Sequence, residues 1–169
     1  LLQRRKADLL PQLTSLEDDP VVTALREAAQ ELGVWILVGS ALVRRADGKI
    51  ANRSTLVGPD GAIAAAYDKL HMFDVDLPTG ETARESEAYE PGDRAVIARV
   101  GEASVGMTVC YDMRFPQLYR ALALAGAQVM TGWACRKRTS AGVRSTRGAG
   151  AHDDIGPSTS PSAPAATVR

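Results

Sequence analysis

The sequence contains few of the residues that mark several protein classes. Its two cysteines, Cys110 and Cys135, are too few for a disulfide framework. No apolar run approaches the roughly 18 residues that a membrane-spanning helix needs, and the first residues lack the apolar core of a signal peptide. Twenty basic residues balance twenty acidic residues, so charge gives no basis for a nucleic-acid or membrane partner. We therefore expect a protein of the reducing cytoplasm.

The amino-acid composition is typical of one globular domain followed by a low-complexity segment. The chain has 169 residues, of which 45% are hydrophobic and 24% charged. From about Thr131 large apolar residues become scarce, and Ser, Thr, Gly, Pro, Ala and Arg dominate. Such a segment buries too little surface to offset the entropy lost on ordering. We therefore divide the chain into a domain, residues 1–130, and a low-complexity tail, residues 131–169, which we expect to be disordered.

The pattern of elements within the domain indicates an α/β fold. Asp19 is a suitable N-cap and Pro20 a suitable first-turn residue for a helix that stops at Gly33. Residues 74–95 are expected to form one long loop. Strand, helix and strand follow one another from residue 104 to residue 130, as in a βαβ unit. The remaining expected elements are a helix over 1–10, a helix over 116–125, and strands over 34–39, 41–45, 53–57, 62–67, 95–100, 104–109 and 128–130.

Cys110 lies where an apolar strand meets the start of a helix. A nucleophile at such a turn is held out of the sheet and faces backbone N–H groups. Those groups, with a nearby cation, favour a thiolate and stabilise an oxyanion. The alternative is a small buried cysteine that ends a strand, and the pattern alone does not separate the two.

Lys69 and Glu85 are the other candidate site residues. Lys69 follows a predicted strand, and ligands of α/β sheets bind at the carboxyl ends of strands. Lys69 and Cys110 could therefore face one pocket, although a solvated surface lysine is the alternative. Glu85 could orient such a lysine, but a solvated loop acid is again the alternative. Its context does not distinguish it from the other glutamates of the loop, which are Glu81, Glu87 and Glu90.

Three segments, in order, closely resemble motifs of the nitrilase superfamily of carbon–nitrogen hydrolases. They are residues 67–76 (YDKLHMFDVD), residues 84–86 (RES) with 91–93 (PGD), and residues 106–116 (GMTVCYDMRFP). The most similar branch is the one that holds ω-amidase and deaminated-glutathione amidase. The resemblance spans roughly residues 1–130 and implies part of an αββα sandwich, a partial carbon–nitrogen hydrolase domain.

The resemblance also implies a reaction and roles for particular residues. The enzyme would hydrolyse the carbon–nitrogen bond of a small amide that bears a carboxylate, through a cysteine thioester, and would release ammonia. Cys110 would be the nucleophile, Lys69 the lysine of a Glu-Lys-Cys triad, and Glu85 a second glutamate. The backbone N–H of Tyr111, together with Lys69, would form the oxyanion site. The resemblance implies no cofactor and no metal, and a homo-oligomer in the complete enzyme.

Several alternatives stay open. Arg114 could bind a substrate carboxylate or pair with a carboxylate of the core such as Asp112. His71 could be a site residue, but we expect it to make a structural hydrogen bond from the strand end. A metal site made of Cys110, Cys135, His71 and His152 fits no zinc spacing. A thiol-redox role has no Cys-x-x-Cys motif to support it.

The sequence departs from the family pattern at both ends. The triad base lies in a Pro-Glu motif, and the opening segment here, Leu1 to Arg4, resembles the segment just after that motif. Residues 131–169 match none of the family's continuation, as expected for a frameshifted or otherwise mistranslated end. The alternative function is therefore a catalytically inactive fragment that lacks the triad glutamate, and we expect little amidase activity from these 169 residues alone.

Overall fold

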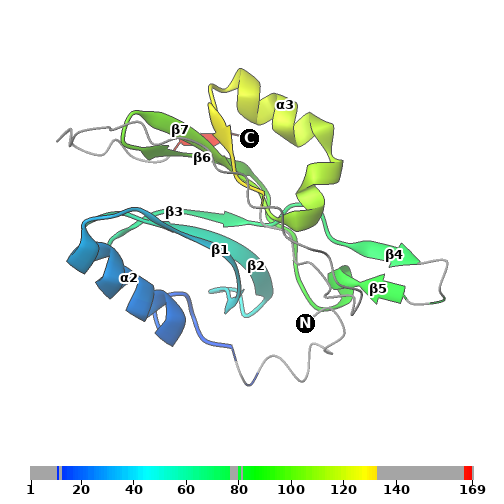
Figure 1. Cartoon of the computed structure of the whole chain (residues 1–169). Coiled ribbons are helices and arrows are strands. Elements are labelled where there is room, and N and C mark those ends of the chain that lie inside the picture. Colours follow the sequence, from blue (N-terminus) through cyan, green and yellow to red (C-terminus); the bar gives the residue numbers. More distant parts are fainter. Residues whose placement is uncertain (1–10, 12, 77–79, 81, 133–165, 169) are drawn as a thin grey trace, which may run out of the picture.

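The fold was analysed on a computed structural model, which describes residues 11, 13–76, 80, 82–132 and 166–168. Two sheets lie face to face, and a helix covers the outer side of each (Figure 1). The first sheet is antiparallel, with the order β1-β2-β3. Its strands are β1 (Ile36–Arg44), β2 (Ile50–Val57) and β3 (Ile63–Asp68). Helix α2 (Pro20–Leu32) covers its outer face.

The second sheet has the order β8-β7-β6-β9. Strands β7 and β8 pair in parallel and helix α3 (Pro116–Leu124) connects them, so the predicted βαβ unit is confirmed. The strands are β6 (Ala95–Val100), β7 (Ala103–Met107), β8 (Val129–Met130) and β9 (Ala166–Val168). Strand β9 pairs with β6.

The alternation of side chains along β6 explains the layers. Ala95 and Ile97 pack with α3, whereas the intervening Val96 and Ala98 pack against the first sheet. On the far side, Val22 of α2 packs against the outer face of the first sheet. The layers are therefore helix, sheet, sheet and helix, and the predicted αββα sandwich is confirmed. The buried cluster between the sheets consists of Leu56, Ala65, Tyr67, Val96, Ala98, Met107 and Val109.

The ends of α2 follow the sequence prediction. The Asp19 side chain accepts hydrogen bonds from the backbone N–H groups of Val21 (2.8 Å) and Val22 (3.0 Å). Gly33 ends the helix in the left-handed conformation, with φ 63°. The Asp47-Gly48 pair, a typical hairpin sequence, lies in the turn that joins β1 to β2, and Gly48 has φ 79°.

Two predictions about local structure are wrong. The strands predicted over 34–39 and 41–45 are one strand, β1 (Ile36–Arg44). Its register is irregular between Val38 and Ala41, because a bulge absorbs the extra residue without ending the strand. Residues 74–95 are not one long loop, because they contain the antiparallel strands β4 (Asp74–Asp76) and β5 (Thr82–Arg84) and a short 3-10 helix, η2 (Glu85–Glu87). Strands of three residues are too short to show a period in the sequence.

Two expectations fall on residues outside the described ranges. These are the helix over 1–10 and most of the tail, residues 133–165. Within the tail, residues 166–168 form strand β9. The division at about residue 130 and the disorder of residues 133–165 remain predictions. None of the helices in the described part of the chain is long and apolar enough to cross a membrane.

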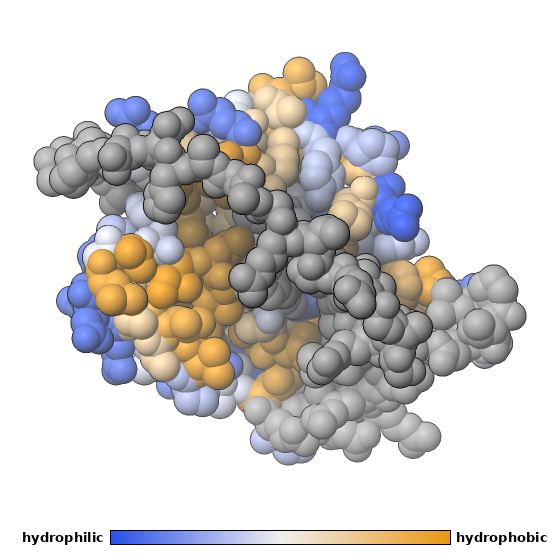
Figure 2. Space-filling model, viewed as in Figure 1, coloured by the Kyte–Doolittle hydropathy of each residue, from blue (hydrophilic) through white to orange (hydrophobic). Residues whose placement is uncertain are grey.

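Apolar side chains gather on one face of the molecule, over α2 and β1 (Figure 2). The helix exposes Val21 and Leu32, with 62% and 68% of their surface accessible, and Val34, two residues after its end, is 41% accessible. Strand β1 is one of the two outer strands of its sheet within the described residues. An apolar face beside an outer strand is a surface suited to further protein contacts.

Candidate active site

Lys69 lies at the end of β3 and its backbone is held from two sides. Its N–H donates to the Asn52 carbonyl of β2 (2.9 Å), and its carbonyl accepts from the Gly92 N–H (2.9 Å). A Cβ at Gly92 would lie 2.3 Å from the Asp68 carbonyl oxygen, so this close approach requires glycine. Only 1% of the Lys69 surface is accessible. The alternative of a solvated surface lysine is therefore wrong.

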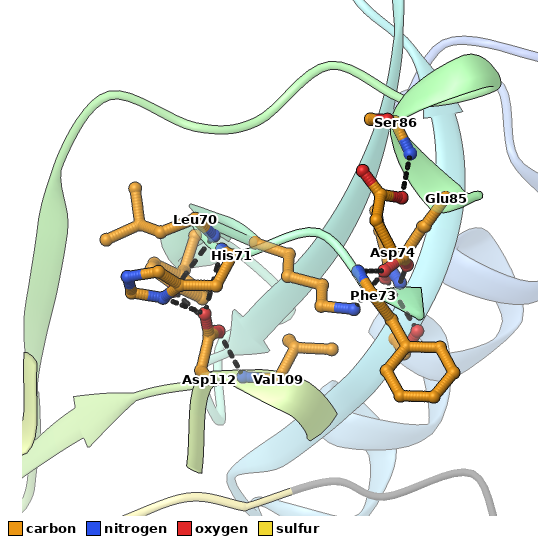
Figure 3. A network of polar contacts seen from close by, with 12 residues as sticks. Leu70, His71, Phe73, Asp74, Glu85, Ser86, Val109 and Asp112 are labelled. Carbon is orange, nitrogen blue, oxygen red and sulfur yellow. Dashed lines mark hydrogen bonds and ion pairs between the residues drawn. The ribbon is translucent and has the colours of Figure 1, made fainter. Parts of the chain in front are cut away.

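The buried ammonium of Lys69 pairs with Glu85. Lys69 Nζ donates to Glu85 Oε2, and only 3% of the Glu85 surface is accessible. The same oxygen accepts from the Phe73 backbone N–H (2.7 Å), and Oε1 lies 3.5 Å from the amide nitrogen of Asn52. Figure 3 shows the backbone nitrogen of Phe73 facing the Glu85 carboxylate, while the Phe73 ring points away from it. The Glu85 carboxylate thus holds both the Lys69 ammonium and the backbone at Phe73 in place.

The β4–β5 hairpin brings Glu85 to this position. Glu85 follows β5 directly, and its N–H donates to the Phe73 carbonyl (3.3 Å). The Ser86 N–H donates to Asp74 Oδ1 (3.0 Å), and hydrogen bonds from the Ser86 hydroxyl and backbone hold the pKa of Asp74 below its ordinary value. Among the loop's other glutamates, Glu87 is exposed and Glu90 pairs with Lys49 at 3.6 Å. Geometry therefore separates Glu85 from Glu87 and Glu90, whereas Glu81 lies outside the described residues.

Cys110 begins a short 3-10 helix, η3 (Cys110–Arg114), and two residues separate it from the end of β7. It is the one described residue other than glycine with a positive φ, at 50°. The left-handed conformation costs such a residue roughly 1–2 kcal/mol. The Asp112 N–H donates to the Val109 carbonyl (3.1 Å), which closes the turn around Cys110. The side chain is a free, partly buried thiol.

The carboxylate of Asp112 joins the segment around Cys110, residues 109–112 (the Cys110 turn), to the segment around Lys69, residues 67–71 (the Lys69 turn) (Figure 3). Asp112 is fully buried. Its Oδ2 accepts from the Tyr67 hydroxyl (2.7 Å) and the Val109 N–H (2.9 Å). Its Oδ1 accepts from the His71 N–H (3.1 Å) and lies 2.8 Å from the ring nitrogen Nδ1 of His71. Burial, and then the charge of Asp112, raise the pKa of Tyr67 well above its ordinary value.

Aromatic rings also pack between the segments that carry Lys69 and Cys110. The His71 ring stacks on Phe115, with centroids 3.6 Å apart and planes inclined by 10°. Tyr111 packs edge-on against Phe73 at 4.9 Å and against Phe115 at 5.5 Å. The hydrogen bond between His71 and Asp112 agrees with the structural role expected for this histidine.

The remaining residues singled out from the sequence are Arg114 and the candidate metal ligands. Arg114, the last residue of η3, is exposed, and no hydrogen bond or ion pair joins it to Asp112 in the described part of the chain. Within the described residues no three side chains of metal-ligating type gather at one point. Cys135 and His152 lie outside the described ranges. The sequence analysis did not assign a role to Asp112 or Asn52. The one available signal was the position of Asp112, two residues after Cys110, where an acidic residue can cap the first turn of a helix.

Known proteins resemble this chain in sequence. The family model described as carbon–nitrogen hydrolase matches residues 4–155. A deaminated glutathione amidase from Yersinia enterocolitica is 42% identical over 117 residues, covering 68% of this chain and 41% of that protein. Omega-amidase NIT2 from Homo sapiens is 37% identical over 106 residues, covering 63% of this chain and 38% of that protein. The chain thus spans about two fifths of the length of these relatives.

Solved structures agree with the sandwich described above. The NitFhit protein of C. elegans superposes with a TM-score of 0.64 at 25% identity, covering 76% of this chain and 31% of that one. An amidase from Nesterenkonia sp. has the same fold, with a TM-score of 0.61 at 23% identity, covering 76% of this chain and 46% of that one. The match of the family model to residues 4–155 and the relatives above 30% identity show that this chain belongs to the carbon–nitrogen hydrolase family.

Proposed function

We propose that Cys110 is the nucleophile of an amidase. The Cys110 thiolate attacks the amide carbon, a carbon–sulfur bond forms, and the carbonyl electron pair moves to oxygen. Collapse of this intermediate breaks the carbon–nitrogen bond, and the nitrogen takes a proton and leaves as ammonia. Water then attacks the thioester carbon, the carbon–sulfur bond breaks, and a carboxylic acid and the free thiol are released.

The observation that carries the proposal is the backbone of Cys110. A left-handed conformation at φ 50°, between a strand and a 3-10 helix, holds the thiol out of the sheet. Unusual conformations of this kind persist where the surrounding structure enforces them, and they concentrate at active sites. A cysteine that only filled the core would have no need of this conformation.

Lys69 and Glu85 have different roles in the proposed site. Lys69, whose charge is buried beside Glu85, stabilises the negative oxygen of the intermediate together with the Tyr111 N–H. Glu85 already accepts from Lys69 and Phe73, so it orients the lysine and is a poor base for the thiol. The base is therefore a different carboxylate, which the family resemblance places in a Pro-Glu motif.

The proposed substrate is a small ω-amide that bears a carboxylate. The relatives with the names deaminated glutathione amidase and omega-amidase support this class. Arg114 follows Cys110 by four residues in the same short helix and exposes its guanidinium, which suits a substrate carboxylate. The named relatives and the family match give no support to the alternative of an inactive remnant.

The proposal extends to the setting of the enzyme. We propose a cytoplasmic protein that acts without a nucleic-acid or membrane partner, on the basis of its balanced charge and its two cysteines. A homo-oligomer is supported by the apolar face over α2 and β1 (Figure 2).

Ammonia release tests the proposed reaction. The assay uses a chain that is extended upstream to include the Pro-Glu motif and that continues after Met130 with the sequence typical of the family. The substrate is α-ketoglutaramate or deaminated glutathione. We expect ammonia release that Cys110→Ala abolishes and that Arg114→Ala weakens through a higher KM. An active Cys110→Ala variant would exclude the mechanism, and an unchanged KM for Arg114→Ala would exclude that residue from substrate binding.

A further inference from the structure

We propose that Asp112 is a positioning residue of this site, whose buried carboxylate fixes the Cys110 turn against the Lys69 turn. The inference rests on the proposed roles of Cys110 and Lys69. Asp112 itself is fully buried and does not need to touch a substrate. It acts by setting where the thiol and the ammonium lie relative to one another.

The hydrogen bonds of Asp112 use its full capacity as an acceptor. An ionised carboxylate accepts at about four positions and donates at none. The Tyr67 hydroxyl and the Val109 N–H occupy Oδ2, while the His71 N–H and the His71 ring nitrogen occupy Oδ1. Because the carboxylate only accepts, the ring nitrogen Nδ1 of His71 carries a hydrogen. A group with every acceptor position occupied holds its neighbours in place and is not available as a base.

The donors come from both sides of the proposed site. Tyr67 and His71 flank Lys69 at two residues on either side, and both are bonded to Asp112. Val109 directly precedes Cys110 and is bonded to the same carboxylate. One side chain therefore fixes the backbone around both the proposed nucleophile and the proposed oxyanion-stabilising cation.

The same bonds enforce the left-handed backbone of Cys110. The Val109 N–H donates to the Asp112 carboxylate, and the Asp112 N–H donates back to the Val109 carbonyl. These two bonds close a ring across Cys110 and Tyr111. Without the carboxylate, the Cys110 φ of 50° has one constraint fewer and can relax to the ordinary right-handed region.

Asp112→Asn tests this role, since asparagine keeps the size of the side chain but turns one acceptor oxygen into an NH₂ donor that faces N–H and O–H donors. The readout is the rate of alkylation of Cys110 by iodoacetamide in the full chain, followed by mass spectrometry across a range of pH. Cys135 in the same molecule is the internal reference. Circular dichroism establishes that each variant is folded at the assay temperature.

We expect Cys110 to be alkylated faster than Cys135 in the wild type. Asp112→Asn should slow the reaction of Cys110 roughly tenfold or more and move its pH profile to higher pH, because misplacement of reacting groups by about 1 Å is costly. Tyr67→Phe, which removes one of the hydrogen bonds, should have a smaller effect in the same direction. Asp19→Ala removes the N-cap of α2, away from the site, and should lower stability without changing the alkylation rate.

A folded Asp112→Asn variant with unchanged reactivity at Cys110 would overturn the positioning role while leaving Cys110 as the proposed nucleophile. If Asp112→Asn does not fold, Tyr67→Phe decides, and unchanged reactivity in that variant overturns the role. A wild-type Cys110 no more reactive than Cys135 would overturn the proposed function and this inference together.

Discussion

Replacing Glu85 by glutamine leaves the buried charge of Lys69 without its partner. Lys69 and Glu85 are 1% and 3% accessible, so water cannot replace the lost carboxylate. Removing one partner of a buried ion pair costs about 3–5 kcal/mol. The Phe73 N–H also loses a charged acceptor, which costs about 1–3 kcal/mol when a buried donor is left unsatisfied. These costs overlap, so we expect Glu85→Gln to lower the free energy of unfolding by about 3 kcal/mol or more.

Urea denaturation followed by circular dichroism measures this change, and Glu90→Gln is the matched control. Glu90 pairs with Lys49 at 3.6 Å, but their side chains are 37% and 51% accessible, so this substitution should cost less than about 1 kcal/mol. The double variant Lys69→Met with Glu85→Gln should recover part of the loss, because no unpaired buried charge remains. Equal destabilisation by Glu85→Gln and Glu90→Gln would refute the buried pair.

Three further predictions follow from the packing and hydrogen bonds. Tyr67 has a pKa in the folded state that is raised above its ordinary value of 10.0. Its contribution to stability is therefore complete below that pH and is lost as the pH rises above it. The free energy of unfolding should therefore fall there by up to about 1.4 kcal/mol per pH unit, and the fall should lessen in Tyr67→Phe. Gly92→Ala places a Cβ against the Asp68 carbonyl and should lower stability by about 1–3 kcal/mol in urea titrations, whereas Gly132→Ala, with no atom within 4 Å, should not. Asp19→Ala should lower the Tm by an amount equivalent to about 1 kcal/mol, since it removes the N-cap of α2, and an unchanged Tm would contradict that cap.

The sequence predicted most of the fold because local chemistry marked the element ends. Asp19, Pro20 and Gly33 delimit α2, and the Asp47-Gly48 pair marks the first hairpin. The β4–β5 hairpin escaped prediction because its strands are short and polar. It is stabilised by an Arg84–Asp76 ion pair of 2.5 Å and by a bond from Arg84 to the Val75 carbonyl, and neither can be read from periodicity.

The candidate site was predicted less completely than the fold. Cys110 and Lys69 follow strands that the sequence identifies, so their positions at strand ends could be predicted. Glu85 could be singled out only by resemblance, since its burial depends on a hairpin that the sequence does not reveal. Asp112 could not be assigned a role, because its partners Tyr67 and His71 lie 45 and 41 residues earlier in the chain and only the folded sandwich brings them together.

The most direct test of Cys110 as the nucleophile is acylation by the mono-p-nitrophenyl ester of glutaric acid, a carboxylate-bearing acyl donor. Its leaving group needs no proton, so the step requires only the thiolate and a stabilised oxyanion. We expect a burst of p-nitrophenolate of about one per chain, a thioester on the peptide that contains Cys110, and no burst in Cys110→Ala. A burst of equal size in Cys110→Ala, or an acyl group found on Cys135 or on lysines and absent from Cys110, would contradict the proposed nucleophile.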